Sequence, residues 1–214
     1  MIDVSLYAAF LVAAFVLVII PGPDMMLIIA LGARHGPTAG FMAALGVAGG
    51  LAVHTAAAAL GLSALFTYVP VLYHVLRWAG AAYLVVLAIA AFRDRGVVAD
   101  EAPTDPACVV PSRKERWRCF RQALITNVLN PKVIIFNVAF LPQFVNPAMG
   151  NIAVQLLILG ATLVLIDLSI DGPLGLAAGR LGQVLRRQRF ARVLNVSCGA
   201  IFTALALRLV LIRD

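Results

Sequence analysis

Long stretches without a charged residue alternate with short basic segments along this chain. Asp, Glu, Lys and Arg are absent from Val4 to Pro23, from His35 to Leu76 and from Val133 to Ile166. A helix that crosses the hydrocarbon of a bilayer needs about 20 apolar residues. The second stretch, 42 residues long, exceeds one span, and we expect it to fold back on itself.

Turn-forming residues divide these stretches into six expected spans. Gly, Pro and Asn gather between the apolar segments, most densely from Pro142 to Asn151. The pattern predicts an all-α integral membrane protein with six transmembrane helices. The expected spans are residues 5–32, 40–62, 70–92, 122–144, 152–173 and 193–212.

Two of these spans, the first and the fourth, are interrupted by proline. The interruptions are Pro21-Gly22-Pro23-Asp24 and Asn127-Val128-Leu129-Asn130-Pro131-Lys132. Proline lacks an amide donor and crowds the carbonyl one turn earlier. We therefore expect free carbonyls around residues 17–19 and an exposed helix start at Asp24. Broken helix ends of this kind hold substrates or ions in transporters; the alternative is a packing kink.

The composition excludes a soluble domain. The chain is 62% hydrophobic and 13% charged, against roughly half and a quarter in soluble proteins. No basic residue precedes the first apolar stretch, so we expect that stretch to remain as a helix rather than act as a cleaved signal. The three cysteines, Cys108, Cys119 and Cys198, lack metal-ligand spacing. We expect no metal and no cofactor.

The basic residues indicate an orientation. Loops 33–39, 93–121 and 174–192 hold thirteen Lys and Arg residues, and the two other loops hold none. Because basic loops stay in the cytoplasm, these three should face inward and both termini outward. The net charge of +7 thus reports membrane orientation rather than a nucleic-acid partner.

The two halves of the chain resemble each other weakly. Gly80-Ala81-Ala82-Tyr83 parallels Gly199-Ala200-Ile201-Phe202 at an offset of 119 residues. A repeat of three spans has odd parity, so its second copy is inverted in the membrane. We predict one membrane domain of two inverted three-helix repeats, residues 1–92 and 122–214, joined by a cytoplasmic loop over 93–121.

Ionisable side chains inside the expected spans are costly and therefore mark candidate function. Asp167 and Asp171 are four residues apart, which places them on one helix face. With Asp24 and Lys132, they are predicted to bind a substrate ammonium group and to relay protons. The alternatives are a structural ion pair between Lys132 and Asp167, and an interfacial position for Asp171 beside Pro173.

Three further polar residues lie within the expected spans. Asn127 and Asn130 share one face and are predicted to bind a zwitterion, or alternatively to cap the broken helix. His54 lies in the middle of the second span, where it serves either as a proton relay or as a hydrogen-bond partner of a neighbouring helix.

Small residues recur at four-residue spacing in the second span. Gly36 and Gly40 form one such pair, and Gly46 and Gly50 form another. Small residues at this spacing let helices approach closely. They indicate either tight packing within the chain or the seam of a homodimer.

Several of these segments occur together, in order, in one known family. The chain resembles the LysE/RhtB amino-acid exporters over about residues 5–210. The resemblance is carried by Pro21-Gly22-Pro23-Asp24, Gly32-Ala33-Arg34-His35-Gly36, Gly40, Leu76-Arg77-Trp78-Ala79-Gly80-Ala81-Ala82-Tyr83-Leu84, Asn130-Pro131-Lys132 and Phe140-Leu141-Pro142-Gln143-Phe144.

The resemblance implies a secondary transporter, not an enzyme, in the bacterial inner membrane. It would export amino acids or derivatives of the homoserine/threonine, basic or branched-chain type by proton antiport. A metal-cation exporter and a non-transporting structural membrane protein are the alternatives. The candidate substrate or ion residues are Pro21, Gly22, Pro23, Asp24, Asn127, Asn130, Pro131, Lys132 and Asp167, with His54 and Asp171 as candidate proton relays. Asp167 lies beyond the matching motifs, so its role rests on its charge alone.

Overall fold

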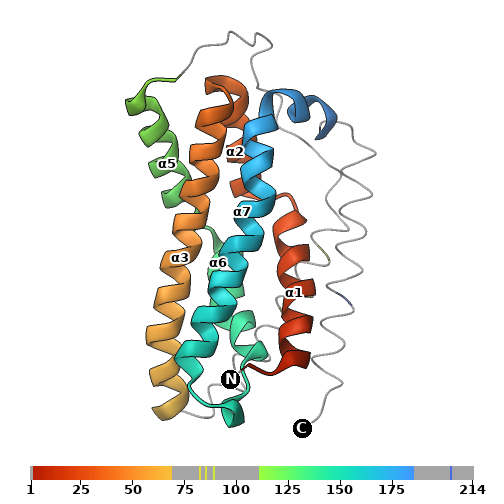
Figure 1. Ribbon diagram of the computed structural model, residues 1–214, viewed down its shortest axis with the longest axis vertical. Helices are drawn as coiled ribbons and strands as arrows, with labels where there is room; N and C mark the ends of the chain where they lie inside the picture. The colour runs from red at the N-terminus through yellow and green to blue at the C-terminus, as the bar shows by residue number, and fades with distance from the viewer. Residues whose placement is uncertain are drawn as a thin grey trace.

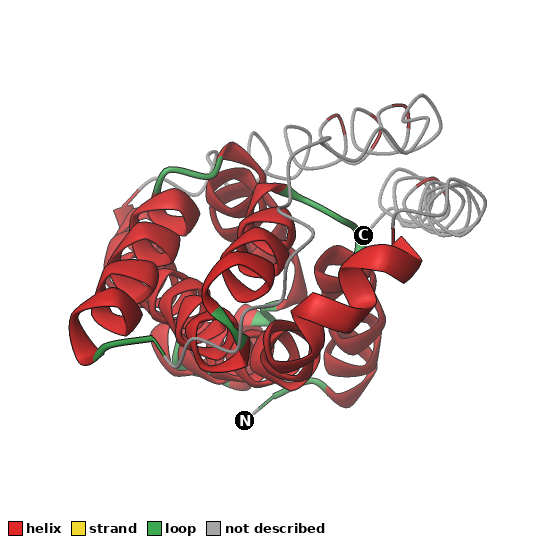
Figure 2. Ribbon diagram, turned by 90° about the horizontal axis from the view of Figure 1, so that it is seen from above, coloured by secondary structure: helices red, strands yellow, loops and turns green. Residues whose placement is uncertain are grey.

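The computed structural model describes residues 2–68 and 111–185, with residues 82, 85, 89 and 203 as isolated positions. This part of the chain contains helices and loops and no strand, so the all-α prediction is confirmed for it (Figure 2). The helices are α1 (Val4–Ile19), α2 (Pro23–His35), α3 (Pro37–Tyr68), α5 (Arg113–Val128), α6 (Pro131–Ile135) and α7 (Ile152–Leu185), with a π-helix, η1 (Phe136–Phe140), and two 3₁₀ turns, η2 (Leu141–Phe144) and η3 (Pro147–Met149).

The two long helices α3 and α7 pack along each other through the middle of the bundle (Figure 1). Both contain a segment long and apolar enough to cross a membrane, Pro37–Gly61 in α3 and Ile152–Ala178 in α7. α5 packs against α3, α1 packs against α7, and α2 contacts both long helices. These contacts form the frame that holds the two interrupted helices.

The interrupted helices run in opposite directions past this frame. α1 leads from one end of the bundle to mid-height and α2 continues to the other end, whereas α5 and α6 descend the opposite way (Figure 1). The chain bends by 49° between α1 and α2 and by 52° between α5 and the segment from Pro131 to Phe144. Counting each bent pair as one span gives up to four of the six predicted spans. The predicted third and sixth spans, 70–92 and 193–212, lie largely outside the described residues, and the inverted repeat stays a prediction.

Two predicted boundaries are wrong. The loop predicted over 93–121 becomes helical at Arg113, because Ser112 and Glu115 form a capping box. The Ser112 hydroxyl accepts from the Glu115 amide at 3.2 Å, and the Glu115 carboxylate accepts from the Ser112 amide at 2.7 Å. The fifth span was predicted to end at Pro173, yet α7 continues to Leu185. The helix persists because Leu174 and Ala178 beyond the proline are buried in the bundle.

The turn between α2 and α3 is shorter than predicted. The sequence placed seven residues between the first two spans, and the structure has Gly36 alone between the two helices. Gly36 adopts a φ of 89°, a conformation that glycine reaches without a steric penalty. This turn places α3 alongside α2.

Small residues of α3 bring its backbone against neighbouring helices. A Cβ atom added to Gly40 would overlap the backbone of Gly175 in α7. One on Gly46 would meet the Phe120 carbonyl of α5, and one on Gly50 would meet the Asn127 side chain. Packing within the chain, the first of the two interpretations of this spacing, accounts for these glycines; a homodimer stays a prediction.

Candidate transport site

A small cavity lies where the two helix interruptions meet α7. Its volume is about 40 Å³. Apolar side chains, among them Val18, Leu51 and Leu163, form part of its wall. The polar residues that line it are Asp24, Asn127, Asn130, Lys132, Asp167 and Asp171, all of which the sequence analysis singled out.

Lys132 reaches from the second interruption into the first. Its ammonium group donates to the carbonyl of Leu17 at 2.8 Å and to that of Ile20 at 3.1 Å. The Leu17 carbonyl lacks its usual helical donor because residue 21 is a proline. Leu17 falls within the predicted range of free carbonyls, whereas Ile20 lies one residue beyond it. A lysine from another helix thus satisfies the backbone that the proline leaves open.

Asp24 makes the reciprocal connection, from the first interruption to the second. Its Oδ2 atom accepts from the side-chain amide of Asn127 at 2.9 Å and from that of Asn130 at 2.8 Å. Asn130 also caps α6, because its Oδ1 atom accepts from the Lys132 backbone amide at 3.0 Å. Asn130 therefore caps the broken helix, as the capping interpretation predicted, and it also contacts Asp24.

Asp167 and Asp171 complete the cavity from α7. Their side chains are 6% and 3% exposed, so both are buried within the bundle. Both lie within electrostatic reach of Asp24 and Lys132. One oxygen of each carboxylate, Oδ2 of Asp167 and Oδ1 of Asp171, has no hydrogen-bond partner among the described residues.

Unpartnered oxygens gather around this one cavity. Besides the two on α7, Oδ1 of Asp24 and Oδ1 of Asn127 are buried without a hydrogen-bond partner in the described part of the chain. Leaving a buried acceptor unpaired costs roughly 1–3 kcal/mol. Three carboxylates therefore face the cavity beside the single ammonium group of Lys132. The arrangement favours a donor-rich or positively charged guest.

Of the remaining predicted residues, only Gly22 lies on the cavity wall. Gly22 lines the cavity, but Pro21, Pro23 and Pro131 do not; the prolines set the backbone path of the two interruptions. His54 is half-buried, and its Nε2 atom lies 3.4 Å from the Asn127 carbonyl. This contact with a neighbouring helix is the one that the hydrogen-bonding interpretation predicts. His54 is connected to Asp24 only through Asn127, whose side chain donates to Asp24.

The sequence analysis did not single out the apolar wall of the cavity. Leu163 lies one helical turn before Asp167 on the same face of α7, so four-residue spacing from the two carboxylates would have found it. Val18 and Leu51 come from other helices. Nothing in their sequence surroundings separates them from other apolar residues, and only the packing of α1 and α3 brings them to the site.

Apolar helices of spanning length around a buried, charged cavity are typical of membrane transport proteins. The chain belongs to the LysE type translocator family, whose family model matches residues 15–213. The sequence resemblance to this family is thereby confirmed.

Three relatives illustrate the range of the family. The chain is 36% identical over 160 residues to the "Uncharacterized membrane protein YrhP" of Bacillus subtilis, covering 74% of this chain and 76% of the relative. It is 30% identical over 204 residues to a leucine efflux protein of Enterobacter, covering 94% and 92% of the two chains. It is 29% identical over 194 residues to a homoserine/homoserine lactone efflux protein of Salmonella typhi, covering 91% and 90%. No solved structure matches the chain.

We predict that Lys132→Met destabilises the fold. The substitution leaves the Leu17 and Ile20 carbonyls without the lysine donor and removes the ammonium group that faces three carboxylates. A loss of about 2 kcal/mol, or about 4–8 °C in the unfolding midpoint, is expected from the unpaired acceptors. Lys114→Met, at an exposed position of α5, is the matched control. The measurement is thermal unfolding of the purified variants in detergent. Equal shifts of the unfolding midpoint in Lys132→Met and Lys114→Met would contradict the prediction.

Proposed function

We propose that the protein is a secondary transporter that exports amino acids or their derivatives, with the cavity between the two helix interruptions as its substrate and ion site. The buried cluster of three carboxylates and Lys132 carries this proposal, because buried charges inside spanning segments are retained where they bind or relay. The names of two relatives, a leucine efflux protein and a homoserine/homoserine lactone efflux protein, support an amino-acid substrate.

The polar groups suit the two ends of a zwitterion. Asp24 and Asp167 offer carboxylate oxygens to the substrate ammonium group, and the unpartnered oxygens supply acceptors for it. Lys132 offers a cation to the substrate carboxylate once it leaves the Leu17 and Ile20 carbonyls. The apolar wall then faces the substrate side chain, whose size sets the choice among leucine-like, homoserine-like and basic amino acids.

The present cavity is too small for such a substrate. Its volume of about 40 Å³ compares with roughly 300–1,000 Å³ for sites that hold small-molecule ligands. It exceeds the roughly 10–15 Å³ that one water needs. We infer that this is a closed conformation, and that binding requires the two interruptions to move apart and Lys132 and Asp24 to change partners.

A proton gradient is the proposed source of energy. Asp171 lies beside Asp167 on one face of α7, and His54 contacts the backbone of a residue that binds Asp24. A carboxylate in the cavity would take up a proton from outside and release it inside. Binding of the proton and binding of the substrate ammonium group to this carboxylate would then exclude each other. The proposed relay therefore runs through Asp171 and Asp167, with His54 at its edge.

Metal-cation export is the second candidate, because carboxylates are ligands for hard cations. Within the described ranges, no group of three His, Cys, Asp or Glu side chains lies close enough to hold a metal ion. The amides of Asn127 and Asn130 also occupy one oxygen of Asp24, which leaves fewer ligands for a metal ion. Amino-acid export is the better supported function.

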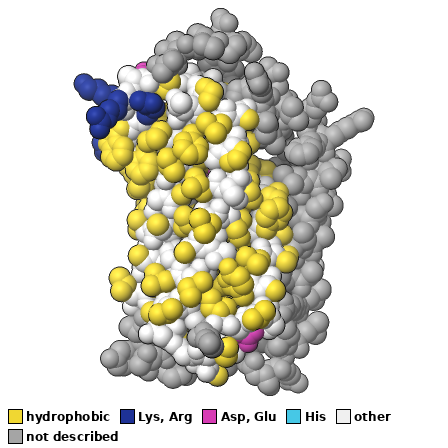
Figure 3. Space-filling view, viewed as in Figure 1, with side chains coloured by type: hydrophobic (Ala, Val, Ile, Leu, Met, Phe, Trp, Pro, Cys, Tyr) yellow, Lys and Arg dark blue, Asp and Glu magenta, His cyan; other side chains and the backbone are white. Residues whose placement is uncertain are grey.

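We propose an inner-membrane location with the basic end of the bundle in the cytoplasm and both termini outside. The Lys and Arg side chains visible in Figure 3 gather over α5 at one end, and most of the visible side chains below them are apolar. In a variant without native cysteines, Ala148→Cys should react with a membrane-impermeant thiol reagent in intact cells. Lys114→Cys should react only after permeabilisation. If Lys114→Cys reacts in intact cells and Ala148→Cys does not, the protein has the opposite orientation in the membrane.

Asp24→Asn and Lys132→Ala should abolish export. Both remove a charge from the cavity, and Asp24→Asn does so without changing side-chain size. Cells loaded with leucine, homoserine or lysine should export at least about 10-fold more slowly, as expected for losing about 1.4 kcal/mol of binding. Glu115→Gln, which removes a carboxylate outside the cavity and keeps the capping box, should export normally. Normal efflux by both cavity variants at equal membrane abundance would refute the site.

Asp171→Asn should separate substrate exchange from proton coupling. In proteoliposomes with substrate on both sides, exchange should persist, because Asp24 and Lys132 remain. An imposed pH gradient should drive accumulation of substrate in proteoliposomes that hold the wild-type protein. The same gradient should have little effect on proteoliposomes that hold the Asp171→Asn variant. Equal stimulation of both proteins by the gradient would exclude Asp171 from the relay, while export itself would stand.

A further inference from the structure

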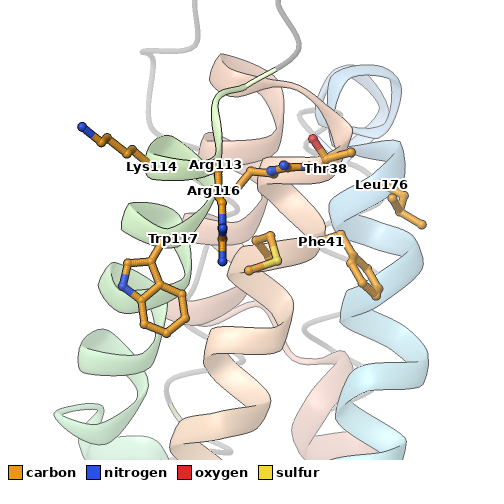
Figure 4. A pocket seen from close by; sticks show the side chains of 8 residues that line it. Thr38, Phe41, Arg113, Lys114, Arg116, Trp117 and Leu176 are labelled. Atoms are coloured by element: carbon orange, nitrogen blue, oxygen red, sulfur yellow. The ribbon is translucent and has the colours of Figure 1, made fainter.

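A second and larger hollow lies at the basic end of the bundle, away from the transport cavity. It is a groove of about 880 Å³ between α3, α5 and α7. Phe41, Met42 and Leu176 give it an apolar side, and Arg113, Arg116 and Trp117 come from α5. In Figure 4, Arg113 extends from α5 toward the start of α3, and Lys114, which also lines the groove, extends outward from α5.

The groove opens at the level where the spanning segments end. The apolar segment of α3 begins at Pro37, next to Thr38 in the groove wall, and that of α7 ends at Ala178, two residues after Leu176. The hydrocarbon of a bilayer gives way to lipid headgroups at this depth. Trp117 is 55% exposed there and stacks on Phe120 with ring centroids 4.9 Å apart. Exposed tryptophan is typical of the membrane interface.

The start of α5 is strongly positive. Its first nine residues carry five cations, Arg113, Lys114, Arg116, Arg118 and Arg121, against one carboxylate, that of Glu115. Glu115 is engaged with Ser112 in the capping box. The groove thus places guanidinium groups directly beside an apolar wall.

We propose that this groove binds an anionic phospholipid of the surrounding leaflet. The phosphate would pair with Arg113 and Arg116, whose planar forks suit phosphate oxygens. The upper part of an acyl chain would cover Phe41, Met42 and Leu176. Basic pockets between spanning helices on the cytoplasmic side are suited to such headgroups. A free phosphate would leave the apolar wall uncovered, so a lipid satisfies both sides of the groove. This site is separate from transport, and its failure would leave the transport proposal intact.

Quenching of Trp117 fluorescence by brominated lipid provides a direct test. The full chain with Trp78→Phe retains Trp117 as its single tryptophan. The protein would be placed in nanodiscs of dioleoyl phosphatidylcholine with increasing mole fractions of brominated phosphatidylglycerol or brominated phosphatidylcholine. Half-maximal quenching should need a mole fraction of brominated phosphatidylglycerol at least about 10-fold lower than that of brominated phosphatidylcholine, since each nearby cation adds to the attraction for the anionic lipid.

Two double variants distinguish this groove from a generally basic surface. Arg113→Gln with Arg116→Gln should remove the preference for the anionic lipid. Arg118→Gln with Arg121→Gln removes the same charge from exposed positions outside the groove and should change the preference by less than about 2-fold. Arg113→Lys with Arg116→Lys retains the charge and should keep the preference, which guards against a loss caused by misfolding.

Three results would overturn the proposal. Equal quenching by both lipids would exclude an anionic lipid site. Equal loss of preference in the two Gln variants would indicate a diffuse field of positive charge. Release of quenching by millimolar inorganic phosphate would indicate a phosphate or soluble anionic ligand instead of a lipid.

Discussion

Every backbone amide and carbonyl inside a bilayer needs a partner from the protein, because hydrocarbon offers none. Proline at position 21 removes one donor from the first helix, and the second interruption at Pro131 adds a further break. The structure resolves both by joining them: Lys132 donates to carbonyls of α1, and Asp24 accepts from the two asparagines beside α6. The two interruptions are therefore joined in both directions, by a lysine that donates to backbone carbonyls and by a carboxylate that accepts from side-chain amides.

This mutual dependence links stability to the proposed transport cycle. The hydrogen bonds that close the cavity are also the ones that hold the interrupted helices in place. A substrate with its own ammonium and carboxylate groups can replace them, because it presents the same donors and acceptors. When the cavity opens and substrate binds, Lys132 and Asp24 would exchange their partners within the protein for groups of the substrate. Such an exchange costs far less than exposing the charges to hydrocarbon, where an unpaired ion costs several kcal/mol.

The long helices provide the fixed part of this arrangement. Gly40 and Gly175 bring the backbones of α3 and α7 together, where any larger side chain would force them apart. Lipid tails are as apolar as the helix surfaces, so close packing of this kind replaces the hydrophobic effect as the force between helices. The basic groove lies at one end of the same helices. The frame of α3 and α7 therefore separates the proposed transport site from the surface at which we propose that lipid binds.

The membrane class, both interruptions and the polar residues that line the cavity could be predicted from the sequence, because hydrocarbon excludes charge and proline removes a donor wherever either occurs. That α7 passes through Pro173 could not be predicted, since burial of residues beyond the proline decided it. The helix start at Arg113 does have a local signal, the Ser112 and Glu115 capping box, which the sequence analysis did not use. The burial of Asp171 beside Asp167 also depends on the packing of α7 in the bundle. The partners of Lys132 were equally beyond prediction. A proline shows that a carbonyl is free, but which side chain reaches that carbonyl depends on how helices far apart in the sequence pack together, and only the tertiary structure decides that.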